Sequence, residues 1–395
     1  MLPAKIVFWT SLFIIFYSYI GYGILLWLLL KLRSFFASSR SANLQSADFE
    51  PEVTLLIAAF NESSFIVKKI ENSLGLDYPE GKLKFLFVAD GSSDNTVELI
   101  QQYPQIELHY KPERQGKSMA INRVMPFVTT GIVVFSDANT LLNKDAIKQL
   151  VKHYADPKVG AVAGEKVVDA GEGAGGIAGA GEGLYWKYES FLKKLDARFY
   201  SVVGAAGELF SIRTALFEPV DRSVLLDDFL ISMKICKRGY RVMYEPGAFA
   251  TEAPSFSLKE EQKRKIRISA GGWQSVFMLK ELLNIFKYGR LSFQYISHRV
   301  LRWVVCPWLL PALFIANWFL LFANDPLYNL FFWAQVAFYA AAFAGWLFTQ
   351  INIKVKLLYV PYYFVFMNVA LYLGFIRFMK KSQTVLWDKA KRSNE

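Results

Sequence analysis

Long uncharged stretches at both ends of the chain constrain its fold more than any other feature. Residues 6–30 carry no charged side chain, and at about 1.5 Å per residue a helix of that length crosses a bilayer. Lys31 and Arg33 follow directly, which by the positive-inside rule predicts a cytoplasmic location for the next part of the chain. The alternative is a cleavable signal peptide. The run is too long for one, and the basic residues follow it rather than precede it.

Apolar stretches also close the chain, and we predict a membrane-spanning helix in each of them: residues 303–323, 329–348 and 357–376. Buried core helices are the alternative, but several such stretches in series favour a membrane. Residues 50–255 hold most of the charge, and we expect them to fold as one cytoplasmic domain. We further predict amphipathic helices at the membrane surface over residues 256–300 and a polar tail over residues 377–395.

The net charge of +11 on 395 residues fits a protein that rests on an anionic inner leaflet and handles phosphates. Nucleic acid is not an expected partner, because the basic residues are not interleaved with a known nucleic-acid-binding module. Only two cysteines and three histidines occur, and their spacing suggests neither a disulfide framework nor a zinc site.

The predicted crossings conflict with the charge of the C-terminal tail. Four crossings that start outside leave the tail outside, yet it contains Lys380, Lys381, Lys389, Lys391 and Arg392, which the positive-inside rule disfavours there. The main alternative is that residues 303–323, which contain two prolines, re-enter the membrane without crossing it. No ionisable residue lies inside the predicted spans, which argues against a transporter.

Short apolar runs in the middle of the chain predict a buried parallel sheet. Val53–Phe60, Phe85–Ala89 and Ile132–Ser136 each read as a strand, and a helical pattern follows. Strand, loop and helix repeated in this way indicate an α/β fold with crossover connections. In such sheets ligands bind beyond the carboxyl ends of the strands, where this chain has Glu62, Asp90 and Asp137. The glycine-rich segment Ala170–Gly183 predicts a mobile loop.

Three motifs in this region resemble those of the processive family 2 glycosyltransferases, which include hyaluronan, chitin-oligosaccharide, poly-N-acetylglucosamine and cellulose synthases. The motifs are Ala58-Ala-Phe-Asn-Glu62, Asp90-Gly-Ser-Ser-Asp94 and Gln115-Gly-Lys117. The resemblance implies a GT-A fold, an α/β nucleotide-sugar-binding domain, here joined to transmembrane helices. It also implies that the nucleotide-sugar contacts these side chains: Ala58, Phe60, Glu62, Asp90 and Lys117.

Asp137-Ala-Asn139 stands where this family has an Asp-x-Asp motif, which implies a divalent cation, Mg²⁺ or Mn²⁺, bound by Asp137 and Asn139. Such a cation prefers oxygen ligands and neutralises the departing diphosphate. The second Asp is replaced by Asn139, whose amide oxygen can ligate but brings no charge.

Leu226-Asp227-Asp228, followed by Lys-Arg-Gly239, resembles the acidic helix start of the family. Inverting glycosyl transfer requires one base to remove the proton of the acceptor hydroxyl. The spacing between this acidic pair and Lys-Arg-Gly239, compared with that of the family, implies that Asp228 is the base, with Asp227 beside it on the acceptor side. Gly207 lies in a segment similar to the loop beneath the acceptor sugar. Two acidic residues stabilised by a helix dipole are the simpler interpretation of this pair.

Arg264 and Arg267 stand where the family has Gln-x-x-Arg-Trp, and their i,i+3 spacing suits a clamp on the diphosphate. The family's Trp, which stacks on the acceptor sugar, is replaced by Ile268. We predict that Trp273 takes over this role, because Gly271-Gly272 would bend the helix between Arg267 and Trp273. The alternative for Trp273 is an anchor at the bilayer interface.

These patterns together predict an inverting glycosyltransferase in the inner (plasma) membrane that uses a UDP-sugar. A glycan or a lipid-linked molecule is the expected acceptor, and a growing polysaccharide secreted through the same helices is the expected product. One alternative is the transfer of a single sugar to a membrane lipid. Another is a non-catalytic membrane scaffold with a degenerate nucleotide-binding fold.

Overall fold

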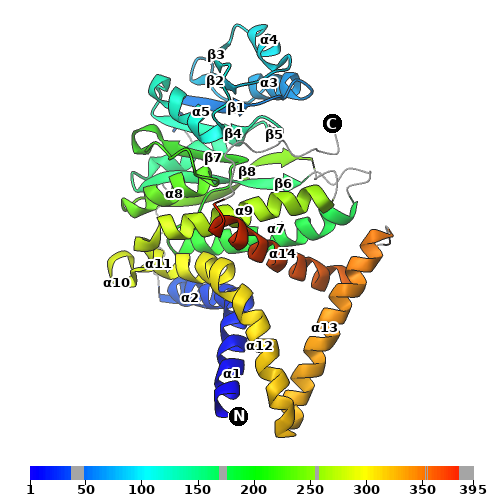
Figure 1. The fold of residues 1–395 in the computed structure, drawn as a ribbon. Coiled ribbons are helices and arrows are strands. Elements are labelled where there is room, and N and C mark those ends of the chain that lie inside the picture. The colour runs from blue at the N-terminus through cyan, green and yellow to red at the C-terminus, as the bar shows by residue number, and fades with distance from the viewer. Residues whose placement is uncertain (37–48, 169–175, 254–257, 352, 354, 382–395) are drawn as a thin grey trace.

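The computed structural model describes residues 1–36, 49–168, 176–253, 258–351, 353 and 355–381. An α/β layer lies above a group of long helices that project away from it (Figure 1). Within the α/β layer the strands are β1 (Val53–Ala59), β2 (Leu83–Asp90), β3 (Ile106–Lys111), β4 (Ile132–Asp137), β5 (Thr140–Leu142), β6 (Val159–Val168), β7 (Leu209–Arg213) and β8 (Arg241–Glu252). The helices there are α3 (Ile66–Leu74), α4 (Thr96–Gln101), α5 (Lys117–Val124), α6 (Ala146–Val151), α7 (Gly176–Phe199) and α8 (Asp227–Lys237).

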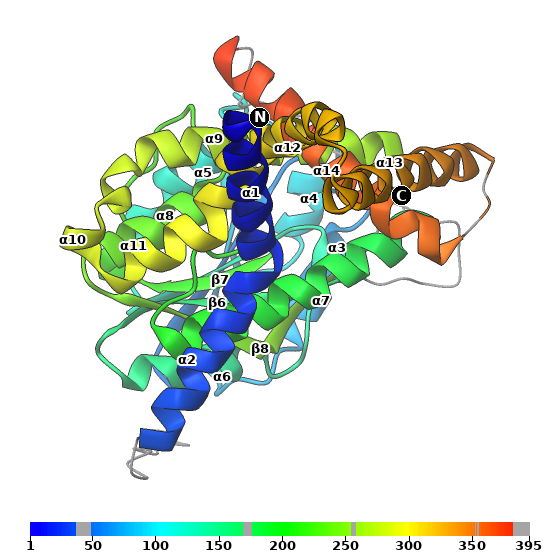
Figure 2. The same cartoon turned by 90° about the horizontal axis from the view of Figure 1, so that it is seen from below.

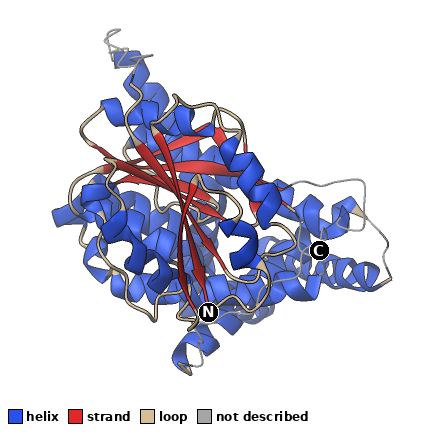
Figure 3. Ribbon diagram, turned by 90° about the horizontal axis from the view of Figure 1, so that it is seen from above, coloured by secondary structure: helices blue, strands red, loops and turns tan. Residues whose placement is uncertain are grey.

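The strands form one twisted mixed sheet in the order β3-β2-β1-β4-β7-β6-β8-β5 (Figure 3). β1 pairs in parallel with both β2 and β4, which confirms that the three predicted strands lie side by side. Their carboxyl ends therefore meet at one edge, as the sequence predicted. The other strands were not predicted. β7 runs antiparallel between β4 and β6, so the sheet is mixed rather than parallel throughout.

Alternation of side chains along the central strands gives the sheet two apolar faces. Leu56 and Phe135 point to one face, where α5 and α8 cover them. Ile57 and Val134 point to the other, where α3, α4 and α6 pack. Because both faces are buried, β1 reads as a continuous apolar run in the sequence.

The remaining helices are α1 (Leu2–Phe16), α2 (Tyr22–Phe36), α9 (Leu258–Met278), α10 (Ile285–Tyr288), α11 (Arg290–Tyr295), α12 (Cys306–Leu320), α13 (Pro326–Gln350) and α14 (Lys356–Met379). Four helical segments of the described chain are long and apolar enough to cross a membrane: Leu2–Phe35, Arg290–Ala323, Pro326–Gln350 and Leu357–Met379. They overlap the four apolar stretches found in the sequence.

The second of these segments begins well before Trp303 and is helical throughout, including at Pro307 and Pro311. It therefore contains His298, Arg299 and Arg302, and all three are buried. The predicted span 303–323 itself holds no ionisable residue, but the helix that contains it extends further toward the α/β layer than apolar composition indicated, and these three residues lie in the extension.

The predicted glycine-rich loop is also partly wrong. Residues 169–175 lie outside the described part of the chain, but residues 176–183 form the first turns of α7. Later turns of α7 anchor the helix, because Leu192 and Leu195 pack on Tyr22 and Leu26 of α2. Tertiary packing of this kind overrides the low helix propensity of glycine.

Helix α9 continues through Gly271 and Gly272 without the predicted bend. These glycines serve close packing instead. A Cβ at Gly271 would lie 2.7 Å from Cγ of Leu226, and one at Gly272 would lie 3.0 Å from Cε3 of Trp303. Helix α14 runs along another side of α9. Figure 1 and Figure 2 show that α14 crosses the underside of the α/β layer, whereas α12 and α13 extend away from it.

Candidate active site

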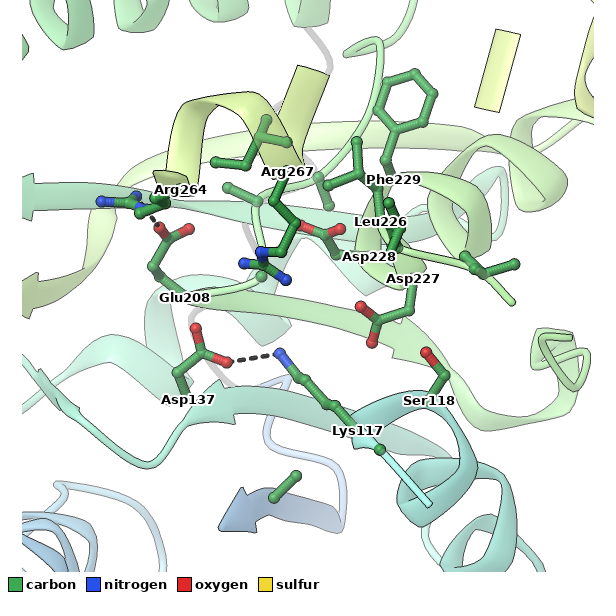
Figure 4. A pocket seen from close by; sticks show the side chains of 18 of the residues that line it. Lys117, Ser118, Asp137, Glu208, Leu226, Asp227, Asp228, Phe229, Arg264 and Arg267 are labelled. Atoms are coloured by element: carbon green, nitrogen blue, oxygen red, sulfur yellow. Dashed lines mark hydrogen bonds and ion pairs between the residues drawn. The ribbon is translucent and has the colours of Figure 1, made fainter. Parts of the chain in front are cut away.

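A cavity of about 540 Å³ opens where the carboxyl ends of β1, β2 and β4 face the membrane-side helices. Ten predicted site residues line it: Ala58, Phe60, Glu62, Asp90, Lys117, Asp137, Asn139, Gly207, Asp227 and Asp228. Arg264 and Arg267 of α9 complete the wall opposite the sheet (Figure 4). Of the predicted site residues only Trp273 is not part of this lining.

Lys117 and Asp137 form the centre of the cavity floor. Nζ of Lys117, at the start of α5, lies 2.5 Å from Oδ1 of Asp137 at the end of β4. Burial opposes the charge on Lys117, but Asp137, Asp227 and Asp228 outweigh it and raise the pKa of the lysine. Burial also raises the pKa of Asp137, against the effect of Lys117. Lys117 thus remains a fixed cation among three carboxylates.

Asp227 and Asp228 begin α8 and enter the cavity from the side opposite β4 (Figure 4). Oδ2 of Asp227 is buried and accepts no hydrogen bond from any residue that the structure describes. Beside the pair, a Cβ at Gly207 would lie 3.1 Å from Oδ2 of Asp228 and 3.5 Å from Nζ of Lys117. The absence of a side chain at Gly207 therefore keeps the space between this acid and this cation open.

Burial, and then the charge of Asp227, raise the pKa of Asp228 to about 7, although Lys117 opposes the shift. A carboxylate with a pKa near the working pH is a suitable general base, since it is ionised yet still basic enough to accept a proton. The raised pKa of Asp228 is therefore compatible with the predicted role of this residue as the base.

Two segments shape the end of the cavity farthest from the membrane helices. Asp90 accepts hydrogen bonds from the backbone N–H groups of Gln115 (2.7 Å) and Gly116 (2.6 Å), and it pairs with Arg123 at 3.3 Å. Asp90 therefore positions the turn that carries Lys117. Arg114 was not predicted, but it also lines the cavity, and its guanidinium lies 3.6 Å from the ring centre of Phe60.

Arg264 and Arg267 differ in their surroundings although both lie on one face of α9. Arg264 approaches Glu208 (3.7 Å) and Glu252 (4.0 Å), which also bind Lys166. Burial and the neighbouring Arg264 lower the pKa of Arg267, while the carboxylates of Asp227, Asp137 and Asp228 oppose this. Arg267 therefore faces the reactive carboxylates, whereas Arg264 is part of a charged cluster at the edge of the cavity.

Comparison with known proteins matches residues 51–271 to the family described as glycosyltransferase like family 2. The chain belongs to this family. It is similar to poly-β-1,6-N-acetyl-D-glucosamine synthases, at 27% identity over 252 residues for Staphylococcus aureus and 24% over 254 residues for Staphylococcus epidermidis. Each match covers 58% of the synthase and 60% or 61% of this chain, so it spans little more than half of those relatives.

Among solved structures, the fold resembles a mannosyltransferase from Pyrobaculum calidifontis in complex with GDP-Man and Mn²⁺. The TM-score is 0.69 at 22% identity, and the alignment covers 95% of this chain and 100% of the other. The likeness establishes a GT-A fold. The family match makes this chain a family 2 glycosyltransferase.

The cavity of this glycosyltransferase suits a metal ion that arrives with its nucleotide. No group of three or more His, Cys, Asp or Glu side chains with metal-binding geometry occurs in the described ranges. Asp137 and Asn139, the two predicted ligands, both line the cavity and carry side-chain oxygens. Mg²⁺ and related ions are commonly held by one or two protein oxygens plus substrate phosphates and water, so this ligand set fits a cation completed by a diphosphate.

The predicted role of Trp273 as an acceptor platform is contradicted by its position. Its side chain is only 5% exposed, and its ring packs 4.7 Å from that of Phe375 in α14. The prediction failed because it required a bend at the two glycines, and α9 is unbroken there. Among the aromatic residues that line the cavity, Trp303 lies next to the helix start of Asp228: its ring is 5.3 Å from that of Phe229, the residue after Asp228.

A pH profile tests the state of Asp228. Since the base must be ionised, we expect kcat/KM to fall as the pH drops through about 7, where Asp228 becomes protonated. The log of kcat/KM should have a slope near one below that pH. A profile that stays flat down to pH 5 would contradict a raised pKa for the base.

Proposed function

We propose that this family 2 glycosyltransferase is a membrane-bound, inverting enzyme that transfers a sugar from a UDP-sugar to an acceptor hydroxyl. The observation that carries the proposal is the convergence of Lys117, Asp137, Asp228 and Arg267 from separate elements in one cavity, which the membrane-side helices close at its other end. A cation, an ionisable base and a diphosphate-binding arginine are the groups that such a transfer needs.

The transfer is a single displacement. Asp228 accepts the proton of the acceptor hydroxyl while its oxygen attacks the anomeric carbon, and the bond to the nucleoside diphosphate breaks on the opposite side. Lys117 and Arg267 stabilise the negative charge that develops on the leaving diphosphate. When bound, a divalent cation would add to this stabilisation from Asp137 and Asn139. Asp227 orients the acceptor next to the base.

The experiment is to incubate the purified protein, in lipid and with Mn²⁺ or Mg²⁺, with radiolabelled UDP-sugars and GDP-sugars and to size the products. We expect label to move from one UDP-sugar to an acceptor. Long labelled products would fit the polysaccharide synthesis named for the relatives, and a single added sugar would identify a non-processive transferase. Cleavage of GDP-sugars alone would contradict the choice of nucleotide.

We propose Trp303, in place of Trp273, as the aromatic surface for the acceptor sugar. An aromatic face suits the C–H face of a pyranose, and Trp303 lies beside the helix start that carries the base. Trp303→Ala should lower transfer about 10-fold or more through acceptor KM, by loss of a contact of roughly 1–3 kcal/mol. Donor hydrolysis to UDP should persist.

Trp303→Phe, which keeps an aromatic face, is the conservative control and should retain most of the transfer. Trp273→Ala is the matched tryptophan control and should leave acceptor KM unchanged, even if it lowers the thermal midpoint. Equal effects of Trp303→Ala on transfer and on donor hydrolysis would leave Trp303 as a packing residue only.

We also propose an inner-membrane location with three crossings, by α1, α12 and α13, rather than four. Helix α14 packs on α9: a Cβ at Gly374 would meet Cβ of Ser269 at 2.5 Å, and Phe378 stacks on Phe277 at 5.3 Å. An arrangement along the membrane surface leaves the C-terminus on the catalytic side, where its basic residues satisfy the positive-inside rule.

A cysteine at Ser393, treated with an impermeant thiol reagent on intact cells, tests this topology. We expect no labelling until the cells are permeabilised. Ala323→Cys, in the turn between α12 and α13, is the control and should react on intact cells; the native Cys236 and Cys306 are both buried. Labelling of the Ser393 variant on intact cells would restore the fourth crossing.

A further inference from the structure

The end of the cavity nearest the membrane helices carries cations that the donor does not require. Lys193 of α7, Arg299 in the helical turn between α11 and α12, and Arg377 of α14 all line it. Trp186 and Trp303 lie with them. All of them lie on helical segments: α7, the helix that leads into α12, and α14, which are in the membrane-proximal part of the molecule (Figure 1).

Lys193 is the informative member of this group. Its side chain is only 2% exposed, yet its Nζ has no hydrogen-bond partner among the residues that the structure describes. It lies instead over two aromatic faces, 5.4 Å from the ring centre of Trp186 and 5.6 Å from that of Tyr244, whose hydroxyl is also unsatisfied. A buried ammonium without a hydrogen-bonding partner is costly, so such a group indicates a missing ligand.

The acidic groups around Lys193 do not neutralise it. Glu189, one turn earlier on α7, is held at 2.8 Å by Arg299 and at 3.3 Å by His298. Arg302 approaches Glu189 at 3.7 Å. Glu165 of β6 accepts a hydrogen bond from Ser190.

The more distant Glu208 is bound by Lys166 and Arg264. Burial lowers the pKa of Lys193, and the nearby charge of Arg299 lowers it further. The charges of Glu189 and Glu165 oppose this shift but do not cancel it. An anion placed at Nζ would stabilise the ammonium form, and Arg299 and Arg377 line the same cavity.

We propose that Lys193, with Arg299 and Arg377, forms a second anion site that binds the phosphate of a membrane lipid, and that the sugar head group of this lipid is the acceptor of the transfer. This deepens the proposed function and rests on it. Its residues come from other helices than Lys117 and Arg267, the residues proposed for the donor diphosphate, although all of them line one cavity. A phosphate bound here would leave a hydroxyl of the lipid head group free to reach Asp228.

The surroundings of the site indicate that the bound phosphate belongs to a lipid and is not free phosphate. The helix that carries Arg299 and Trp303 is one of the four segments able to cross a membrane, and Arg377 lies on another. Trp186 and Trp303 add aromatic side chains of the kind that lie at the polar boundary of a bilayer. Cations on such helices bind phosphate head groups while the acyl chains stay in the bilayer.

The test is the thermal midpoint of the full-length protein in a neutral detergent, titrated with phosphatidylglycerol. This probe has a phosphate and free head-group hydroxyls. We expect it to raise the midpoint of the wild type, whereas dioleoylglycerol, which lacks the phosphate, and glycerol phosphate, which lacks the acyl chains, should not do so at the same concentration. In Lys193→Met the midpoint should require at least 10-fold more phosphatidylglycerol for the same rise.

Lys194→Met is the matched control, because Lys194 is the next residue on α7 and its side chain is exposed. It should respond as the wild type does. Without lipid, Lys193→Met should unfold at or above the wild-type midpoint, since it removes an unpaired buried charge. If Lys193→Met does not fold, Lys193→Gln provides the same comparison with a polar, uncharged side chain.

An equal response of Lys193→Met and wild type to phosphatidylglycerol would overturn the site. If glycerol phosphate raised the midpoint of the wild type as much as phosphatidylglycerol does, the ligand would not need to be a lipid. If dioleoylglycerol did so, the ligand would not need a phosphate. Either result would overturn the proposal. UDP with Mn²⁺ is titrated in parallel on the wild type. If UDP raises the midpoint and the lipid does not, only this inference is overturned. If UDP does not raise the midpoint, the proposed function is overturned.

Discussion

Asp228→Asn should abolish sugar transfer while the protein still binds nucleotide. The amide has nearly the same shape as the carboxylate but cannot accept the acceptor proton, and positioned bases contribute on the order of 10²–10⁴-fold to rate. We expect kcat to fall by roughly 10³-fold and the Kd for UDP with Mn²⁺ to change by less than about 3-fold. Single-turnover transfer and UDP titration, on the same preparation, measure the two quantities.

The matched control is Asp221→Asn, an identical change at an exposed aspartate in the loop that leads to α8. It should keep wild-type transfer. If Asp228→Asn retained more than a tenth of wild-type turnover, Asp228 would not be the base. A comparable loss of UDP binding would instead assign Asp228 to the donor site.

Asp137→Ala should have the second-largest effect, through the nucleotide rather than the acceptor. It removes the carboxylate that pairs with Lys117 and that we expect to ligate the cation. Wild-type UDP binding should strengthen with Mn²⁺ and weaken when the metal is chelated. In Asp137→Ala the metal should no longer matter, and UDP should bind about 10- to 100-fold more weakly, in the range reported for perturbed metal sites.

Asp77→Ala controls for the loss of an acidic side chain, because Asp77 is exposed and makes only a surface ion pair with Lys148 at 3.0 Å. Metal-dependent UDP binding should persist there. Full activity of the wild-type enzyme in excess chelator would contradict the assignment of a metal ion to Asp137 and Asn139.

The core of the fold could be predicted because its signals are local. β1 is a continuous apolar run since both of its faces are buried, and polar residues follow β1, β2 and β4 directly at the edge where they meet. The strands on the far side of the sheet, β6 and β8, carry mixed side chains such as Lys166 and Glu245, so their sequence gives no clear strand pattern.

Several residues that line the cavity could be predicted for the same reason, since Lys117, Asp137 and Asp228 each lie within a short recognisable motif. The membrane side was not. Lys193, Arg299 and Trp303 come from helices that are distant in sequence, and only tertiary packing brings them to one wall. Trp273 was chosen for its proximity in sequence to Arg267, but the two glycines that suggested a bend instead allow close helix contacts.

The anomeric configuration of the product tests the central claim most directly. A single displacement with Asp228 as a base predicts that the newly formed linkage has the configuration opposite to that of the sugar in the donor. ¹³C-labelled donor, followed by NMR as it is consumed by the purified enzyme, reports this at the anomeric carbon. Inversion, with release of one nucleoside diphosphate for each linkage formed, is the expected result. Retention of configuration, with sugar covalently attached to Asp228, would contradict the account.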